Sequence, residues 1–432
     1  MADRKLTEVD LVNNTFDNDT SVVIQNNSVK QIPYFKHKKK SFINAIYSGL
    51  SPSNSGIQNS NALQTIIDSL STSGGGIVYI PSGEYQFASA GNQTIGEHCI
   101  RLKSNICIEG DGISTVLLPT GATEKGLDMF YYNELTDSTN TQPLRNCIFK
   151  NFTIDGKNTS CASYTSAGKG FMINIFENCH WKNVVVKNTD ATGFGVDCPI
   201  DSSITKCVAE NCGKAAQITD VGASGFGIGF GYSYNENLYI SQCRSSGNKK
   251  FGFFFEHQRR FDSEKYTATN NKGFIVSECT ADGNYNNFGG VQAINTQYRN
   301  CFSSTAVNHG YFFENSNDCN VIGCYSVMEG NTSFVILSSD TDGGTQEVKD
   351  ISYNQCISKY TSFGAKIVQY GSTAAMTRNL IKDCYFDATI TNSVYTSGTM
   401  ESLILQGNVH NNADNNFEAI ISTFTNKYNS WN

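Results

Sequence analysis

Two acidic residues, Asp197 and Glu256, end two short segments that share one residue pattern. The segments are Gly-Phe-Gly-Val-Asp over 193–197 and Gly-Phe-Phe-Phe-Glu over 252–256. With two carboxyl groups about 6.5–9.5 Å apart, an inverting glycosidase protonates the leaving oxygen with one and activates a water with the other. An apolar surround favours the acid role, because it raises the pKa of a carboxyl group. Since three phenylalanines precede Glu256, we predict Glu256 as the general acid and Asp197 as its partner.

Polar and aromatic side chains near Glu256 are predicted to bind the substrate. Four of them follow Glu256 in an insertion, one lies a repeat earlier, and one ends a later copy of the same segment. Aromatic rings stack on sugars, and charged groups bind acidic sugars. The six predicted substrate-binding residues are Tyr232, His257, Arg259, Arg260, Asp262 and Glu314.

The spacing of cysteines and histidines does not favour a metal site. The chain has 15 cysteines and 6 histidines, but it contains no Cys-x-x-Cys pair. The histidines do not cluster near cysteines at zinc-ligand spacing. We therefore expect no metal ion and no cofactor.

The elements that position the two acids are predicted from an internal repeat. Seven cysteines recur in one local context, with an apolar residue three positions before each and a polar turn and second short strand after it. The shortest unit is about 22 residues, which cannot bury its apolar face alone and must stack on copies of itself. This pattern predicts an all-β fold, a single-stranded parallel β-helix. The cysteines are Cys207, Cys243, Cys279, Cys301, Cys324, Cys356 and Cys384.

Stacking places equivalent residues of successive coils above one another, about 4.8 Å apart. We expect the cysteines to form a buried thiol ladder without disulfides. A buried aromatic ladder is predicted from Phe194, Phe226, Phe253, Tyr311 and Phe334. The predicted outward column is Asp197, Gly229, Glu256, Ala293, Glu314 and Leu337. Asp197 and Glu256 are then two coils apart, with roughly 10 Å between their backbones.

Three zones follow from where the repeat begins. Residues 1–40 lack it and end in the basic run Lys36–Lys40, which we interpret as a linker after a small appended segment. Residues 41–73 form a predicted capping region, because the apolar residues over 61–70 have helical spacing and a helix would cover the first coil. Residues 74–432 are predicted as β-helix, with insertions at 119–143, 157–170, 212–224, 257–271 and 339–347.

Charge and hydropathy exclude two partner classes. The chain has 32 basic and 39 acidic residues, a net charge of −7 and a pI near 5.5, whereas a nucleic-acid binder has a basic surface. No apolar run reaches the roughly 20 residues that span a bilayer, and Met1–Lys5 does not begin a signal peptide. We expect a soluble chain with no nucleic-acid partner, no membrane insertion and no Sec-type export signal.

Several segments resemble pectate-lyase-like right-handed parallel β-helix proteins. The strongest is residues 61–85, which ends Gly-Gly-Gly-Ile-Val-Tyr-Ile-Pro-Ser-Gly-Glu-Tyr, and residues 108–112 and 152–156 are similar. The resemblance covers residues 60–410 and is specific for the fold. The same fold serves pectate lyases, polygalacturonases, mannuronan epimerases and bacteriophage tailspikes, so it does not decide the activity.

Residues 1–33 resemble the N-terminal segments that attach phage tail proteins to the virion. This resemblance implies a tail spike that is assembled in the host cytoplasm, carried on the virion tail through residues 1–40, and homotrimeric. Its partner would be a host surface polysaccharide, which we expect it to bind and cleave. A purely structural or receptor-binding virion protein is the non-enzymatic alternative.

A uronate lyase or epimerase is the other alternative, because such an enzyme abstracts the C5 proton with a base and neutralises the carboxylate. Residues 194–199 resemble the Tyr-Gly-Phe-Asp-Pro-His-Glu motif of mannuronan epimerases but keep only its Gly and Asp. Phe194 stands at the motif's Tyr and Pro199 at its His. Hydrolysis is therefore favoured over elimination, with Arg259, Lys249 or Lys250 left as possible bases.

Overall fold

The computed structural model describes residues 20–25, 28–33, 41–89, 97–122, 126–133, 142–161, 168–217, 223–231, 236–258, 273–339, 348–370, 376–387, 392–398, 400–411 and 415–420. The chain divides into two compact units, residues 1–41 and 42–432. In the first unit, β1 (Thr20–Gln25) and β2 (Ser28–Pro33) pair antiparallel as a hairpin.

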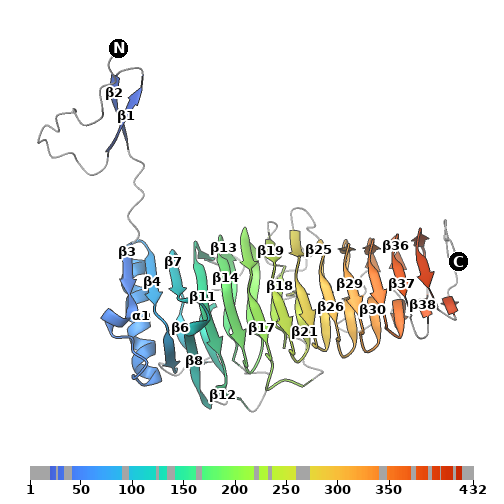
Figure 1. Cartoon of the computed structure of the whole chain (residues 1–432), viewed down its shortest axis with the longest axis horizontal. Helices are drawn as coiled ribbons and strands as arrows, with labels where there is room; N and C mark the ends of the chain where they lie inside the picture. Colours follow the sequence, from blue (N-terminus) through green and yellow to red (C-terminus); the bar gives the residue numbers. More distant parts are fainter. Residues whose placement is uncertain are drawn as a thin grey trace, which may run out of the picture. The chain divides into compact units, whose positions relative to one another are not determined.

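The second unit is a stack of parallel coils, as Figure 1 shows, which confirms the predicted parallel β-helix. Each coil contributes one strand to a long sheet, here called the first face. In stacking order the first face contains β6 (Glu97–Arg101), β9 (Leu127–Asn133), β13 (Phe171–Glu177), β15 (Phe194–Ile200), β18 (Phe226–Phe230), β21 (Phe251–His257), β24 (Asn286–Val291), β27 (His309–Glu314), β30 (Thr332–Ser339), β34 (Phe363–Tyr370), β38 (Asn392–Ser397) and β41 (Asn415–Ile420), with β10 (Leu144–Arg145) beside β13.

Two further rows of parallel strands complete the coils. The second face contains β3 (Ser41–Asn44), β4 (Gly76–Ile80), β7 (Ile106–Gly110), β11 (Ile148–Asp155), β14 (His180–Lys187), β16 (Ser202–Thr205), β19 (Asn237–Ser241), β22 (Gly273–Ser277), β25 (Thr296–Arg299), β28 (Asn320–Ile322), β32 (Ser352–Asn354), β36 (Asn379–Lys382) and β39 (Leu403–Gln406). The third face contains β5 (Gly83–Phe87), β8 (Thr115–Ala122), β12 (Asn158–Ser160), β17 (Val208–Glu210), β20 (Arg244–Ser246), β23 (Thr280–Asp282), β26 (Phe302–Ser304), β29 (Tyr325–Val327), β33 (Ile357–Lys359), β37 (Tyr385–Asp387) and β40 (Val409–Asn411). β31 (Val348–Lys349) and β35 (Met376–Thr377) form a separate short pair.

A single left-handed residue makes the corner between the second and third faces. Its φ lies between 50° and 64° in eight successive coils. A φ of this kind turns the chain within one residue, and the residue after the turn then points inward. The corner residues are Lys206, Gln242, Glu278, Asn300, Gly323, Gln355, Asp383 and Gly407.

The inward residues after these corners include the seven predicted cysteines, all of them buried. No disulfide joins them. The backbone nitrogens of Cys207, Cys243 and Cys301 donate to the thiol of the next coil at 3.3–3.4 Å. Asn408 ends the ladder, where its Oδ1 accepts from the nitrogen of Cys384 at 3.0 Å. The thiol ladder is therefore confirmed as part of the core.

The aromatic ladder is longer than the sequence predicted. Rings of successive coils stack, with Phe194 and Phe226 centroids 4.7 Å apart and Phe226 and Phe253 also 4.7 Å apart. Phe288 fills the predicted gap between Phe253 and Tyr311, at 5.0 and 4.9 Å from them. Its segment, Asn-Asn-Phe-Gly-Gly, lacks the leading glycine that four of the five predicted copies have, and the pattern missed it.

Two sequence-based assignments are wrong. β9 lies inside the predicted insertion 119–143, yet it is an ordinary strand of the first face. Val291, not Ala293, pairs with Glu256 and Glu314 in the outward column. Ala293 is fully buried, since the chain leaves the strand after Val291 and Gln292 adopts a left-handed φ of 54°.

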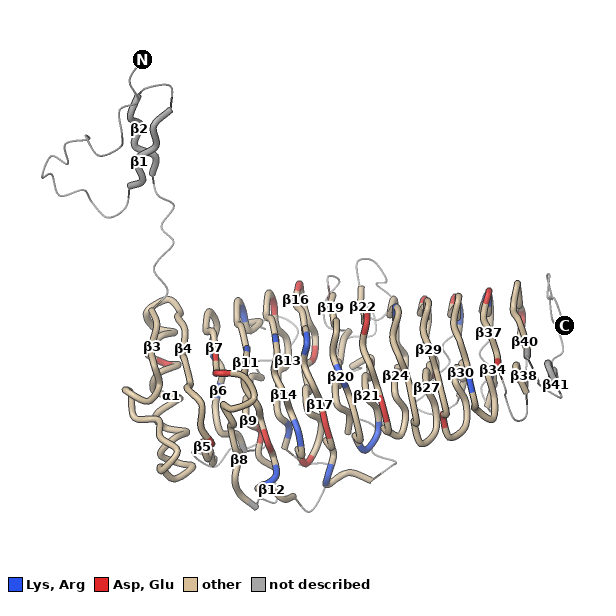
Figure 2. The backbone as a smooth tube through the Cα atoms, in the orientation of Figure 1, with Lys and Arg blue, Asp and Glu red and all other residues tan. Residues whose placement is uncertain are grey.

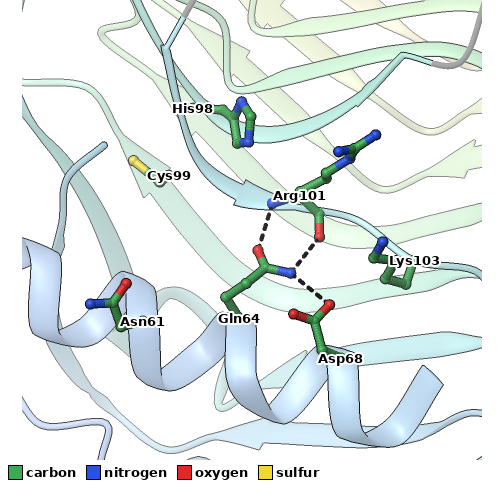
Figure 3. Close-up of a pocket in the computed structure, with 7 residues that line it drawn as sticks. All are labelled: Asn61, Gln64, Asp68, His98, Cys99, Arg101 and Lys103. Atoms are coloured by element: carbon green, nitrogen blue, oxygen red, sulfur yellow. Dashed lines mark hydrogen bonds between the residues drawn. The ribbon is translucent and has the colours of Figure 1, made fainter. Parts of the chain in front are cut away.

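Helix α1 (Gly56–Thr72) caps the first coil. Ser55 and Gln58 form a capping box at its start, and its apolar side, including Leu63, Ile67 and Leu70, is buried. Figure 3 shows Gln64 reaching from α1 to the exposed edge of β6. Gln64 Oε1 accepts from the nitrogen of Arg101 at 2.8 Å and its Nε2 donates to the carbonyl of Arg101 at 3.1 Å. The side-chain amide thus bonds this edge as a neighbouring strand would.

Candidate active site on the first face

The structure brings Asp197 and Glu256 into one outward column of the first face. Asp197 pairs in register with Gly229, and Gly229 pairs with Glu256. The two acids are therefore two coils apart, which places their backbones roughly 10 Å from each other. Glu314 stands in the same column two coils beyond Glu256.

Gly229 lets the side chain of Asp197 lean toward the coil of Glu256. The nitrogen of Gly229 donates to Asp197 Oδ1 at 2.9 Å. A Cβ atom at Gly229 would lie only 2.5 Å from that oxygen, so any other residue here would displace the carboxylate. The lean carries the Asp197 carboxylate over the coil that lies between the two acids.

A kink in the backbone follows directly after this column. Ile175 and Cys198, which come next after Asn174 and Asp197, have φ of 59° and 58°. A β-branched residue such as isoleucine rarely adopts this conformation, and each such residue costs about 1–3 kcal/mol. Strain of this kind gathers where a side chain must be held in one direction. Here the strained residues fix the outward direction of the column.

Asn174 is a member of the column that the sequence prediction missed. It pairs in register with Asp197, on the side away from Glu256. Its side chain is only 1% exposed, yet within the described ranges neither its amide oxygen nor its amide nitrogen has a hydrogen-bond partner. Most buried amides are fully bonded, so this one stands ready for a ligand. Its segment, Gly-Phe-Met-Ile-Asn over 170–174, follows the pattern that identified Asp197 and would have revealed it.

Gln258 was also missed. Its Cγ atom lies 2.6 Å from the position that a Gly229 Cβ would take, so its side chain borders the same gap as the Asp197 carboxylate. Its backbone nitrogen donates to the carbonyl of Phe230 at 2.7 Å, which fixes the residue beside the column. An amide at this place offers both a donor and an acceptor to a sugar hydroxyl.

Two paired glycines and the side chain of Lys169 lie beside Asp197. Gly195 and Gly227 pair in register in the neighbouring outward column, so no side chain rises from it there. The aliphatic chain of Lys169 crosses Gly195, with its Cδ 2.7 Å from where a Cβ would be. A shallow floor with a cation at its edge suits a sugar ring that carries hydroxyl or acidic groups.

Of the six predicted substrate-binding residues, the structure describes two, His257 and Glu314. His257 is 4% exposed and packs edge-on against Phe230, with centroids 5.3 Å apart, so it belongs to the interior. The carboxylate of Glu314 accepts a hydrogen bond from Ser339 and lies two coils from Glu256. Tyr232, Arg259, Arg260 and Asp262 lie outside the described residues.

A separate pocket of about 330 Å³ lies between α1 and β6. Figure 3 shows its lining: Asn61, Gln64, Asp68, His98, Cys99, Arg101 and Lys103. β6 precedes β15 by three coils, roughly 14 Å, so the pocket is distinct from the acid pair. Burial and the charge of Arg101 lower the pKa of His98, whose ring stacks on Tyr131 at 4.6 Å. The polar groups that line the pocket join helix α1 to β6, the first strand of the first face.

Charged and metal-binding groups are sparse across the described ranges. In Figure 2 short acidic and basic stretches are scattered along the tube, most of which is coloured as other residues. No three His, Cys, Asp or Glu side chains within these ranges gather as metal ligands. Over the same part of the chain, none of the helices has the length and apolar character needed to cross a bilayer.

Comparison with known proteins identifies the family and the fold. The sequence model of the family described as rhamnogalacturonase A/epimerase, pectate lyase-like, matches residues 42–272. Two curated relatives from Azotobacter vinelandii are mannuronan C5-epimerase AlgE1, 36% identical over 81 residues, and AlgE4, 32% identical over 105 residues. These matches cover 18% and 23% of this chain and only 6% and 17% of the relatives.

Solved structures match over most of the chain at low sequence identity. The AlgE4 A-module of Azotobacter vinelandii has a TM-score of 0.64 at 17% identity, covering 90% of this chain and 100% of the module. The tailspike protein of E. coli bacteriophage HK620, in complex with a pentasaccharide, has a TM-score of 0.54 at 12% identity, covering 90% and 71%. Both likenesses concern the fold.

Proposed function

Because this chain belongs to the pectate-lyase-like rhamnogalacturonase A/epimerase family, we propose that it is a phage tail spike that binds and cleaves a host cell-surface polysaccharide. The observation that carries the proposal is the Asp197–Gly229–Glu256 column, in which two outward acids flank a residue without a side chain. The polysaccharide would lie along the first face over the floor at Gly195 and Gly227. The similarity in fold to a tailspike crystallised with a pentasaccharide supports this substrate class.

Hydrolysis follows from the positions of the two acids. Glu256 gives its proton to the glycosidic oxygen as the bond from that oxygen to the anomeric carbon breaks. Asp197 takes a proton from a water whose oxygen forms the new bond to the same carbon. The hydrogen bond from Gly229 suits Asp197 to the base role, because an N–H donor binds a carboxylate more strongly than a neutral acid. Glu256 lies between Gly229 and Val291 in register, neighbours without polar side chains, which suits the acid role.

Elimination from a uronate is the second candidate, and Lys169 is the observation that favours it. Its side chain crosses Gly195, next to Asp197, where a cation would neutralise a substrate carboxylate. The short matches to mannuronan C5-epimerases point to the same substrate class. The epimerase motif is incomplete at Phe194 and Pro199, and for this reason we place elimination below hydrolysis.

Purified protein incubated with host capsule or surface polysaccharide tests the proposal. We expect the viscosity to fall and new reducing ends to appear. Glu256→Gln and Asp197→Asn should each lower the rate roughly 10²–10⁴-fold while glycan binding persists. Glu210→Gln, on the third face, is the matched control and should retain wild-type activity.

The outcomes separate the alternatives. Ultraviolet absorbance of an unsaturated uronate in the products would replace hydrolysis by elimination. Binding without any cleavage by the wild-type protein would make the chain a structural or receptor-binding virion protein. Full activity of Glu256→Gln would remove Glu256 from the mechanism.

The remaining sequence predictions complete the proposal. Residues 1–40 would attach the spike to the virion tail, residues 41–73 would cap the solenoid, and residues 74–432 would form the glycan-binding β-helix as a homotrimer. Antibodies raised against the full chain should label the tail of intact virions in electron micrographs. Label confined to the host cell surface would contradict a virion location.

A further inference from the structure

The pocket between α1 and β6, called here the cap pocket, has the size of a ligand site. Its volume of about 330 Å³ lies within the roughly 300–1,000 Å³ that small-molecule pockets occupy. Asn61, Gln64 and Asp68 line it from one side of α1, since residues three and four apart share a face of a helix. The opposite wall comes from β6 and from Lys103, which follows that strand.

Two cations and one carboxylate line the cap pocket. Arg101 and Lys103 carry the positive charges and Asp68 carries the negative charge, so one net positive charge remains. Within the part of the chain that the structure describes, no acidic side chain forms an ion pair with Lys103. Because an ammonium group donates its strongest hydrogen bonds to anions, the pocket is suited to a ligand with a negative charge.

His98 adds an unpaired ring nitrogen to the wall formed by β6. Its Nδ1 is buried and has no hydrogen-bond partner among the described residues. Because burial, with a smaller contribution from Arg101, lowers the pKa of His98, the ring is neutral at pH 7. A neutral imidazole offers one donor and one acceptor, which suit a hydroxyl group. Most buried polar atoms have a partner, so this nitrogen marks a place for a ligand.

We propose that the cap pocket binds the carboxylate-bearing sugar unit of an acidic polysaccharide. The ligand's carboxylate lies against the charged groups of Arg101 and Lys103. Its hydroxyl groups bond the Asp68 carboxylate and the His98 ring. Gln64 holds Asp68 in place for this contact, because its Nε2 donates to Asp68 Oδ1 at 3.1 Å.

The balance of groups in the cap pocket favours a sugar acid over a phosphate. A single carboxylate neutralises the one net positive charge, whereas a phosphate group carries roughly 1.5–2 negative charges at pH 7. Asp68 repels an anion but accepts a hydrogen bond from a hydroxyl. The matching ligand therefore has one carboxylate and several hydroxyl groups, which is the composition of a sugar acid.

The register of the first face connects the cap pocket to the proposed cleavage site. Successive residues of one outward column pair in the order Arg101, Tyr131, Met172 and Gly195. Lys169 adds a cation beside this column, with its Nζ 3.5 Å from Met172 Sδ. A polysaccharide that follows the column from the floor meets cations at Lys169 and in the cap pocket. This extension rests on the proposed function, whereas binding in the pocket itself does not.

Titration of the full chain with D-glucuronate, followed by NMR of isotope-labelled histidine rings, tests the proposal. The resonance of His98 is identified by its loss in His98→Gln. We expect this resonance to shift and saturate with glucuronate but not with glucose, which lacks the carboxylate. Lys103→Gln should weaken binding roughly 10-fold or more, because it removes a charge-assisted hydrogen bond. Lys182→Gln, at an exposed position of the second face, is the matched control and should bind as the wild type does.

The outcomes decide between a sugar acid and other ligands. A His98 resonance that does not respond to glucuronate overturns the proposal, and so does unchanged affinity in a folded Lys103→Gln variant. Inorganic phosphate that binds as tightly as glucuronate would make the pocket a general anion site and would also overturn it. Circular dichroism establishes that the variants fold. The comparison of glucuronate with glucose needs no Lys103 variant, so it decides the case in which Lys103→Gln fails to fold.

Cleavage kinetics separate this proposal from the proposed function. On an acidic polysaccharide, Lys103→Gln should raise KM and leave kcat unchanged, because the pocket lies away from the bond that breaks. Equal KM values for the variant and the wild type would overturn the extension along the column. If the wild type cleaves no polysaccharide, the proposed function fails, and glucuronate binding still decides the cap pocket.

Discussion

The carboxylate of Asp197 lies over Gly229 and accepts a hydrogen bond from its backbone nitrogen, with Oδ1 2.9 Å away. This contact orients an outward acid along the axis of the solenoid, toward Glu256. A side chain on a neighbouring coil would ordinarily fill that space. The reactive distance in the proposed mechanism therefore depends on a glycine that takes no part in the chemistry.

Gly229→Ala should lower the cleavage activity while the protein still folds. A Cβ at this position would meet Asp197 Oδ1 at 2.5 Å and force the carboxylate away, so we expect cleavage to fall at least 10-fold. Gly273→Ala on the second face is the control, because a Cβ there would meet no atom of the described residues within 4 Å. Initial rates and thermal unfolding of both variants provide the measurement. Equal activity of the two variants would show that the cleavage rate does not depend on the direction of the Asp197 carboxylate.

Asn174→Leu should not destabilise the protein, although the residue is buried. Its amide has no hydrogen-bond partner among the residues that the structure describes, so an apolar side chain of similar size removes a desolvation cost of about 1–3 kcal/mol. Asn59→Leu is the control, because Asn59 is equally buried but bonds Ser51 and Gln86, and its loss should cost at least about 2 kcal/mol. Urea unfolding compares the two variants.

Asn174→Leu should also bind the glycan more weakly than the wild type if Asn174 belongs to the site. A large loss of stability in Asn174→Leu would mean that the amide has a structural partner, and unchanged affinity for the polysaccharide would remove it from the binding face.

Glu329 should make stability depend on pH. It is 4% exposed, inside the solenoid, and accepts hydrogen bonds from Ser303 Oγ at 2.6 Å, Ala306 N at 2.6 Å and Ser326 Oγ at 3.0 Å. Burial raises the pKa of its carboxyl from 4.5 to about 7. Between pH 4.5 and pH 7 the folded protein therefore keeps a proton on Glu329 that the unfolded chain has released. The contribution of this proton to stability is fully present below pH 4.5 and is lost as the pH rises to 7, a change of roughly 3 kcal/mol.

Glu329→Gln should remove this dependence, because the amide does not ionise and still accepts from Ala306. Burial lowers the pKa of His309 to about 3 and that of His410 to about 4, which makes the protein lose stability as the pH falls below 6.5. The difference between variant and wild type, measured by denaturant unfolding at several pH values, isolates Glu329. A constant difference from pH 4.5 to 7.5 would contradict the assignment.

The buried cysteines, both in the thiol ladder and outside it, should be unreactive in the native state. Burial raises the pKa of Cys212 to about 11 and of Cys319 to about 12, and it keeps the pKa of Cys243 and Cys279 well above the usual thiol value. Only the thiolate reacts. At pH 8 we therefore expect a thiol reagent to leave these cysteines unmodified until the protein unfolds, whereas Cys161, which is not fully buried, should react earlier. Rapid native labelling of Cys279, located by peptide mass spectrometry, would contradict a closed core.

The fold could be predicted from the sequence because each coil has to bury the same apolar face against the coils beside it. The inward place after each corner is narrow and takes a cysteine, and the Gly-Phe pattern marks the strand that follows, so the register of Asp197 and Glu256 could be predicted. The alternation of strand side chains could also have placed His257 inside, since it follows the outward Glu256. Gln258 and the cap pocket could not be found in this way, because they depend on contacts between segments with no shared pattern.

Nothing in the repeat itself ends a stack of coils, because the free backbone N–H and C=O groups of the outermost strands can pair with a further strand. At the start of this solenoid a single amide, that of Gln64, occupies the bonding positions of Arg101 on β6 that another chain would otherwise take. The side-chain amide stands in for one residue of a further strand, and the rest of α1 covers the coil around it. A chain that stacks end to end at this place would first have to displace the helix.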